Sequence, residues 1–255
     1  MPTPTHARLV RFGLFEPVPA GLDPAETVAV VLDYITAYQM LHRSAKVKPG
    51  QRVLIHGASG GVGTAFLQLG RLAGVEAFGT CSVQAAEAVR DLGATPIDYR
   101  NSDFVQEIHR LTGDGVDAVF DGIGGDNLWR SRKALRERGR VVVYGFQSKL
   151  QGGRVSSDRP SGRHPLRESA TLLRYIIRNW FLPARKSMVP YSIQWRMRLK
   201  PASFRYDLLT LFDLLQHKKI KPLIAQRLPL CKARHAHELL GGGGVIGKIV
   251  LIPNG

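Results

Sequence analysis

Apolar and polar positions alternate regularly through the middle of the chain. Residues 53–55 form an apolar run that is typical of a buried strand, and apolar positions then recur between Val62 and Leu72 with the spacing of a helix. This succession of strand and helix repeats as far as Gly145. The further predicted strands are 75–80, 94–99, one that starts at 115 and enters a glycine turn by 125, and 139–145, and the further predicted helices are 83–92, 103–113 and 127–138.

Strands that alternate with helices of this length predict right-handed βαβ units and a parallel sheet. We therefore expect an α/β fold of the Rossmann type, a doubly wound parallel sheet with helices on both faces and strand order 3-2-1-4-5. Ligands of such sheets bind beyond the carboxyl ends of the strands. The loops that would open onto this edge are 57–63, 80–82, 122–125 and 145–147.

The first of these loops, "HGASGGVG", joins the first strand to its helix and predicts a phosphate site. Glycines let the backbone approach a pyrophosphate, and the amino end of the new helix attracts it. A triphosphatase loop is excluded because Thr64 and Ala65, not Lys and Ser or Thr, follow Gly63. A short-chain dehydrogenase is excluded because no Tyr has a Lys four residues later. Two interpretations remain open: a dinucleotide-binding turn built on Ala58, Gly60 and Gly63, or an ordinary glycine-rich loop of an α/β domain.

Composition and charge narrow the class of protein. The chain has 255 residues, 44% of them hydrophobic, and 36 Lys and Arg against 20 Asp and Glu, a net charge of +16. We interpret this excess as a solvated basic face without a nucleic-acid partner, since no nucleic-acid-binding signature accompanies it. Two cysteines are too few for a disulfide framework, and no stretch of about 18 apolar residues occurs. We expect a soluble, cytoplasmic protein.

Several motifs, taken together, resemble one family. They are "YITAYQMLHRSAKVKPGQRVLIHGASGGVG", "LGATPIDYR", "GVDAVFDGIGG", "GRVVVYGF" and "AHELLGGGGVIGKIVLIP". The chain resembles, from about Pro19 to Pro253, the zinc-independent, quinone-oxidoreductase-like branch of the medium-chain dehydrogenase/reductase superfamily. The resemblance implies an NADPH-dependent oxidoreductase that transfers hydride to quinones or other α,β-unsaturated carbonyl compounds.

The resemblance also implies a barrel-like catalytic domain ahead of the cofactor domain, of which this sequence shows little. We expect residues 1–24 to be a remnant of that domain, 25–222 to form the dinucleotide-binding domain, and 223–255 to supply strands that normally return to the barrel. Those strands would be left with exposed edges or an unusual partner, which favours a homodimer. The alternative function is therefore a non-catalytic NAD(P)-binding protein or partner-binding module.

The residues that end the second strand favour NADPH over NADH. An Asp or Glu there would bind a free ribose 2′-OH, whereas this chain has Thr80, Cys81 and Ser82, which accommodate a 2′-phosphate. Relatives place a Lys shortly after the serine, and Arg100 is expected to take its place here unless it is a solvated loop residue. The predicted cofactor-binding residues are Thr36, Ala58, Ser59, Gly60, Gly61, Val62, Gly63, Thr80, Ser82, Tyr99, Arg100, Gly124, Gly125, Tyr144, Gly145 and Phe146.

Hydride transfer requires few side chains, because the nicotinamide carries the chemistry. The resemblance places Thr36 near the end of the first helix, facing the nicotinamide. Tyr34 and Tyr144 are the candidate catalytic residues, as hydrogen-bond donors to a substrate carbonyl, or else core tyrosines with their hydroxyls at the rim.

No metal is expected. His235 and His237 lie two residues apart and so point to different faces of a helix, and His56 is interpreted as a packed histidine. The apolar, arginine-containing segment 166–186 is interpreted as a helix that packs in the core or at an interface, in preference to a membrane surface.

Overall fold

The structure is a computed structural model that describes residues 18–144 and 186–253. The predicted sites at Gly145 and Phe146 and the apolar helix predicted within 166–185 lie outside these residues.

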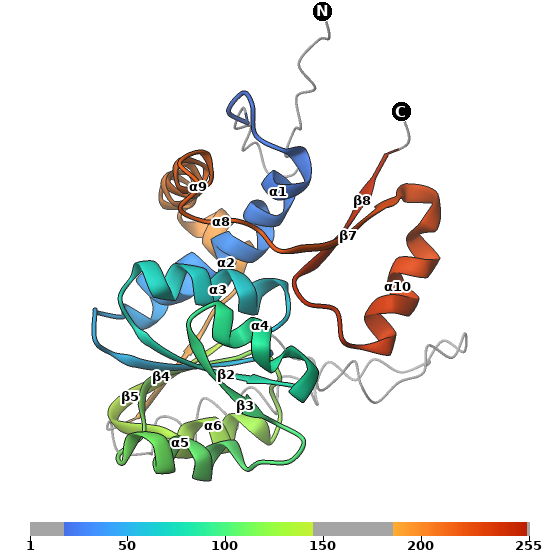
Figure 1. Cartoon of the computed structure of the whole chain (residues 1–255). Coiled ribbons are helices and arrows are strands. Elements are labelled where there is room, and N and C mark those ends of the chain that lie inside the picture. Colours follow the sequence, from blue (N-terminus) through green and yellow to red (C-terminus); the bar gives the residue numbers. More distant parts are fainter. Residues whose placement is uncertain (1–17, 145–185, 254–255) are drawn as a thin grey trace, which may run out of the picture.

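A six-stranded parallel sheet forms the centre of the fold (Figure 1), and its strand order is β3-β2-β1-β4-β5-β6. This confirms the predicted Rossmann-type order and extends it by one strand. The in-register pairs include Ile55 with Gly79 and Ile55 with Phe120, so β1 lies between β2 and β4 at the middle of the sheet. The strands are β1 (Arg52–His56), β2 (Glu76–Cys81), β3 (Ala94–Asp98), β4 (Val116–Asp121), β5 (Leu135–Val143) and β6 (Ser187–Pro190).

Helices cover both faces of this sheet, as the alternation predicts. Ile55 packs in a core with Phe66 of α3 and Leu211 of α9. Leu54 points to the opposite face and packs with Phe104 and Ile108 of α5. The helices are α1 (Pro24–Ala29), α2 (Ile35–Tyr38), α3 (Gly61–Leu72), α4 (Ala86–Asp91), α5 (Phe104–Thr112), α6 (Asn127–Lys133), α8 (Ile193–Leu199) and α9 (Pro201–Gln216), with wider turns η1 (Val30–Tyr34) and η2 (Gln39–Ala45) that make residues 24–45 continuously helical, and a short 3₁₀ turn η3 (Val83–Ala85).

The sequence prediction was wrong at the helix expected over 127–138. Helix α6 ends at Lys133, and β5 already begins at Leu135, which pairs with Val116 of β4. The polar residues "RERGR" are compatible with a helix, but the chain turns within them. Arg138 has φ of 62°, and the pairing register between β4 and β5 shifts at this point. Buried Leu135 reaches the sheet before that turn. Strand β6 was also missed, because its four residues are too few to show an alternating pattern.

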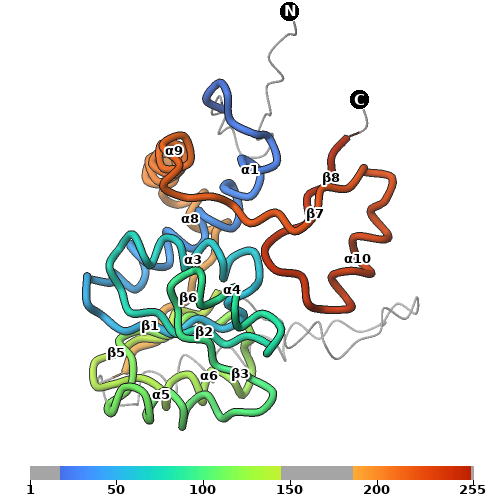
Figure 2. The backbone as a smooth tube through the Cα atoms, viewed as in Figure 1, coloured from blue at the N-terminus to red at the C-terminus, as the bar shows by residue number. Residues whose placement is uncertain are grey.

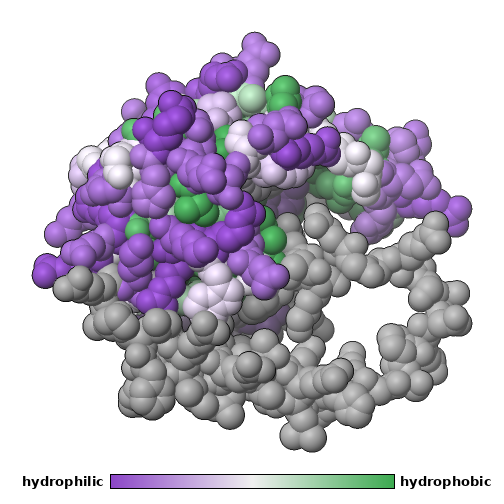
Figure 3. All heavy atoms as spheres, turned by 90° about the horizontal axis from the view of Figure 1, so that it is seen from below, coloured by the Kyte–Doolittle hydropathy of each residue, from purple (hydrophilic) through white to green (hydrophobic). Residues whose placement is uncertain are grey.

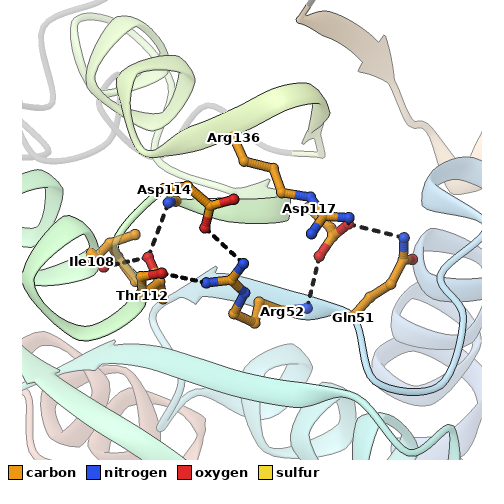
Figure 4. A network of polar contacts seen from close by, with 8 residues as sticks. Gln51, Arg52, Ile108, Thr112, Asp114, Asp117 and Arg136 are labelled. Carbon is orange, nitrogen blue, oxygen red and sulfur yellow. Dashed lines mark hydrogen bonds and ion pairs between the residues drawn. The ribbon is translucent and has the colours of Figure 1, made fainter.

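A polar network closes the amino-terminal edge of the sheet, opposite the predicted ligand edge (Figure 4). The Asp117 carboxylate is 8% exposed, accepts hydrogen bonds from Gln51 Nε2 and the Arg52 backbone N–H, both at 2.9 Å, and pairs with Arg136. The Arg52 guanidinium in turn donates to the Thr112 carbonyl at 2.6 Å. These contacts tie the starts of β1, β4 and β5 together, and so hold the strands whose other ends carry the candidate site.

The C-terminal segment forms a second, two-stranded parallel sheet beside α1 (Figure 2). It consists of β7 (Ile224–Pro229), the 3₁₀ turn η5 (Leu230–Lys232), α10 (Ala233–Gly242) and β8 (Lys248–Ile252). The two predicted C-terminal strands therefore pair with each other.

The face seen in Figure 3 is mostly hydrophilic over the described residues, with small, separate apolar areas. Among the helices of residues 18–144 and 186–253, none combines the length and apolar character that crossing a bilayer requires.

Candidate functional site

The glycine loop connects β1 to α3 at the carboxyl edge of the sheet. Gly57 has φ of 70°, a left-handed conformation that favours glycine, and Gly60 is the N-cap of α3. No side chain among the described residues caps this helix. The N–H groups of its first turn have no acceptor within the helix itself. The loop therefore offers backbone donors at the amino end of a twelve-residue helix, which suits an anionic group.

Close packing requires two glycines here, Gly63 at the start of α3 and Gly79 in the neighbouring strand β2. A Cβ on Gly63 would lie 2.3 Å from the Gly57 carbonyl oxygen and 2.6 Å from the Ala58 carbonyl. A Cβ on Gly79 of β2 would lie 2.5 Å from the Ala58 Cβ. Gly60 differs, because its added Cβ would meet only the Gly57 oxygen, at 3.5 Å. Gly63 and Gly79 thus shape the loop, whereas a Cβ on Gly60 would make only an ordinary van der Waals contact.

A buried chain of hydrogen bonds fixes the ends of β1, β2 and β4 relative to one another. His56 contacts Thr80 Oγ1 through Nδ1 at 3.1 Å and Ser131 Oγ through Nε2 at 3.0 Å. Ser131 Oγ donates to Asp121 Oδ2 at 2.7 Å, and Thr80 Oγ1 accepts the Gly57 N–H at 3.2 Å. The chain of contacts thus runs from the Asp121 carboxylate to the first residue of the glycine loop.

The direction of these bonds assigns the tautomer of His56. Because the Ser131 hydroxyl hydrogen goes to Asp121, its oxygen must accept from His56, which places the imidazole proton on Nε2. Nδ1 then accepts from the Thr80 hydroxyl. Burial lowers the pKa of His56 from 6.5 to about 4 against the opposing effect of the Asp121 charge, so the ring is neutral at physiological pH. His56 is a packed histidine, as predicted.

Asp121 also shapes the second glycine turn. Its Oδ1 accepts the backbone N–H groups of Ile123 and Gly124 at 2.8 and 2.9 Å. Gly124 and Gly125 have φ of 78° and 59°, which explains the two glycines there. The sequence analysis did not single out Asp121, whose other carboxylate oxygen accepts hydrogen bonds from Asn127 and Ser131 of the later helix α6.

Tyr144 follows β5 beside this turn. Its N–H donates to the Asp121 carbonyl at 3.0 Å, and a Cβ on Gly122 would lie 2.8 Å from its Cζ. Gly122 therefore makes room for the tyrosine ring. Burial raises the pKa of the Tyr144 hydroxyl above its ordinary value, and the Asp121 charge adds to the rise. The hydroxyl is thus a neutral hydrogen-bond donor near neutral pH.

The residues predicted to bind a 2′-phosphate lie at the ends of β2 and β3. Ser82 is half-buried at the start of η3, whereas Tyr99 and Arg100 are exposed in the turn after β3. The Arg100 guanidinium lies 5.8 Å from the Tyr99 ring centroid. A nearby carboxylate, Asp98, accepts hydrogen bonds from the Arg100 N–H and the Asn101 side chain, which hold it in the turn.

Tyr34 and Thr36 lie in the helical segment that precedes β1. The helical segment continues to Ala45, so Thr36 lies near its middle, whereas the sequence analysis placed Thr36 near the end of the helix. Thr36 is buried against Tyr191, the residue that follows β6. Tyr34 is 2% exposed and packs close to Gln68 of α3, and burial raises the pKa of its hydroxyl. Its hydroxyl thus faces α3 and not the strand ends.

Sequence reasoning missed a second buried polar chain next to Thr36. The Tyr191 hydroxyl donates to Gln39 Oε1 at 3.1 Å, and Gln39 Nε2 donates to Asp207 Oδ2 at 2.9 Å. Arg43 Nη2 pairs with the other Asp207 oxygen at 2.6 Å. Gln39 of η2 is more than 150 positions in sequence from Tyr191, which follows β6, and from Asp207 of α9, so no local pattern connects them.

The described residues do not form a zinc site. No three His, Cys, Asp or Glu side chains of residues 18–144 and 186–253 gather as ligands. His235 lies 3.7 Å from Glu238, both on the exposed surface of α10, and the buried Cys81 lies at the end of β2. The donor set present here does not fit a zinc ion.

Comparisons with known proteins agree with this geometry. The sequence model described as zinc-binding dehydrogenase matches residues 92–251. A 2-haloacrylate reductase from Burkholderia sp. is 33% identical over 241 residues, which cover 93% of this chain and 66% of the relative. The human synaptic vesicle membrane protein VAT-1 homolog is 40% identical over 137 residues, 53% of this chain and 35% of that protein. The chain thus spans about one third to two thirds of these relatives.

Solved structures show the same relation. The Escherichia coli quinone oxidoreductase complexed with NADPH has a TM-score of 0.75 and 27% identity, with 93% of this chain and 68% of that chain covered. The fold match, the family model and the motifs between about Pro19 and Pro253 all indicate the same family. This chain belongs to the zinc-binding dehydrogenase family, in the quinone oxidoreductase and VAT-1-like branch of the medium-chain dehydrogenase/reductase superfamily.

Proposed function

We propose that the chain binds NADPH along the carboxyl edge of the sheet and serves hydride transfer to a quinone or another α,β-unsaturated carbonyl compound. The observation that carries the proposal is the glycine loop that begins α3 at Gly60 without a side-chain cap among the described residues, together with a β2 that ends in no carboxylate. The solved relative from Escherichia coli is a quinone oxidoreductase complexed with NADPH.

Different residues at this edge would bind different parts of the cofactor. The first-turn N–H groups of α3 would hold the pyrophosphate, and the turn at Gly124, held by Asp121, would border the ribose and ring. Ser82 and Arg100 would contact the 2′-phosphate. When bound, the nicotinamide supplies the hydride, and the protein orients the reactants and excludes water. Tyr144, whose raised pKa keeps its hydroxyl neutral, would donate a hydrogen bond to a substrate carbonyl oxygen.

The test of cofactor choice is titration of the purified chain with NADPH and NADH, followed by nicotinamide fluorescence. NADPH should bind more tightly. Arg100→Ala should weaken NADPH binding about tenfold and leave NADH binding unchanged. A hydrogen bond to a charged group contributes about 1.5–3 kcal/mol, and an exposed site such as this one lies at the lower end of that range. Arg110→Ala is the matched control, because Arg110 is an exposed arginine that pairs with Glu107 on α5. Equal loss of both cofactors with Arg100→Ala contradicts the assignment.

Turnover separates catalysis from cofactor binding alone. NADPH oxidation with 1,4-naphthoquinone is measured across protein concentrations. Turnover that is proportional to protein concentration supports the reductase. A steeper rise supports a homodimer in which a second copy completes the cleft. Tight NADPH binding without any turnover favours the alternative, a non-catalytic NAD(P)-binding protein or partner-binding module.

A further inference from the structure

An ion pair lies against the first residue of α3. Lys248 Nζ is 2.8 Å from Asp33 Oδ2, and the two side chains are 22% and 8% exposed. A Cβ on Gly61 would lie only 2.5 Å from the same Asp33 oxygen. The carboxylate therefore packs directly on the amino end of the helix that the glycine loop begins.

The lysine reaches this position from the far end of the chain. Lys248 begins β8, and the preceding Gly247 donates its N–H to the Ser59 carbonyl at 2.8 Å and forms a parallel bridge with Gly60. The C-terminal segment thus contacts the glycine loop by backbone and by charge. Gly247 has φ of 84°, and a Cβ there would lie 2.2 Å from the Leu223 carbonyl oxygen, so the approach requires glycine.

The charges of Lys248 and Asp33 affect how a cofactor pyrophosphate would bind at the amino end of α3. A carboxylate at a helix amino end is favourable when no ligand is bound, because it faces the positive end of the dipole. The same carboxylate repels a pyrophosphate that comes to the same helix end. Asp33 is largely shielded from water, so solvent screens this repulsion weakly, and a positive charge 2.8 Å away cancels most of it.

We propose that Lys248 neutralises Asp33 and so allows the amino end of α3 to accept the pyrophosphate of a dinucleotide. Lys248 is then a positioning residue that the C-terminal strand contributes to the cofactor site. This inference rests on the proposed function. Because NADPH and NADH share the pyrophosphate, loss of Lys248 affects both cofactors alike, unlike loss of Arg100.

Titration of four variants tests this role. Lys248→Met should weaken NADPH and NADH each by about tenfold, the effect of one unscreened like charge near the phosphates. The double variant Asp33→Asn/Lys248→Met should return to within about threefold of wild type, because no charge remains to be cancelled. Lys248→Arg should bind like wild type. Lys232→Met removes an exposed lysine of the same segment and is the control.

The outcomes distinguish this inference from the function on which it rests. Wild-type chain that binds neither cofactor overturns the proposed function and the inference with it. Wild-type binding with an unaffected Lys248→Met overturns the inference alone. A double variant as weak as Lys248→Met shows that the lysine contacts the phosphate directly, which also overturns it. If Lys248→Met does not fold by circular dichroism, Lys248→Arg and the double variant decide, since neither leaves an unpaired buried carboxylate.

Discussion

Gly63 offers the sharpest test of how the loop is built. The three atoms nearest to an added Cβ all belong to the backbone: the Gly57 oxygen at 2.3 Å and the Ala58 carbonyl carbon and oxygen at 2.6 Å. Backbone atoms cannot rotate away as the end of a side chain can. The substitution Gly63→Ala therefore forces the whole turn and the start of α3 apart by several tenths of an ångström or more.

The free-energy cost follows from the contacts that hold this turn. The Gly60 N–H donates to the Gly57 carbonyl at 3.1 Å, and the Ala58 N–H donates to the Thr80 carbonyl at 2.9 Å. Straining two such bonds costs about 1 kcal/mol each, and overpacking adds about 1–3 kcal/mol. Replacing a helical glycine by alanine returns about 1 kcal/mol. We expect a net loss of about 2–4 kcal/mol in the free energy of unfolding, a fall in Tm of roughly 4–16 °C for a domain of this size.

Thermal and urea unfolding followed by circular dichroism measure this loss. Gly60→Ala is the matched control, because Gly60 lies in the same loop, has φ of −76° and would place its Cβ in ordinary contact. Its Tm should stay within about 1–2 °C of wild type. Gly63→Ala with wild-type stability, or an equal loss in both variants, would refute the packing argument.

Two further predictions concern buried polar groups. The folded pKa of His56, about 4, lies below the 6.5 of the unfolded chain, so the unfolded state binds the proton first and stability falls as pH drops from 6.5 towards 4. The total loss in the free energy of unfolding is on the order of 3 kcal/mol. In urea unfolding, His56→Asn should lose less stability than wild type over this pH range, and equal losses in the two proteins would contradict the prediction. Asp207→Ala should cost about 2–4 kcal/mol, because it leaves the buried Gln39 amide and Arg43 without their shared acceptor, whereas the exposed control Asp213→Ala should cost less than about 0.5 kcal/mol in the same experiment.

The sheet was predictable because its information is local. Each of the first four strands is followed by a helix, the fifth ends in an apolar run, and the handedness of βαβ units then leaves few possible orders. The end of α6 was not predictable in this way. Residues after Lys133 are polar enough to continue a helix, and only the pairing of Leu135 with Val116 ends it. That pairing depends on a strand twenty residues earlier in the chain.

The candidate site was predictable as far as the backbone supplies it. Glycines in a loop between strand and helix indicate a phosphate position, whichever residues surround it. The side chains that orient the site come from separate elements. Thr80 and Ser131 bind opposite sides of the His56 ring, and each looks like an ordinary polar residue in its own segment. The prediction named Thr80 for its place at the end of β2 and missed its bond to the Gly57 N–H.

The C-terminal strands show how a family pattern and local contacts combine. The resemblance assigned β7 and β8 to a barrel, whereas here they pair in parallel, which is possible because α10 provides the long crossover that parallel strands need. A two-stranded sheet is only marginally stable alone. Its contacts with the rest of the chain therefore matter. Gly247 bonds to Ser59 of the glycine loop, and Lys248 pairs with Asp33 of η1, which packs against Gly61 at the start of α3. Any group that moves this loop must also strain these contacts, so order in the C-terminal segment and occupancy of the loop are coupled, and amide exchange in β8 should slow when a dinucleotide binds.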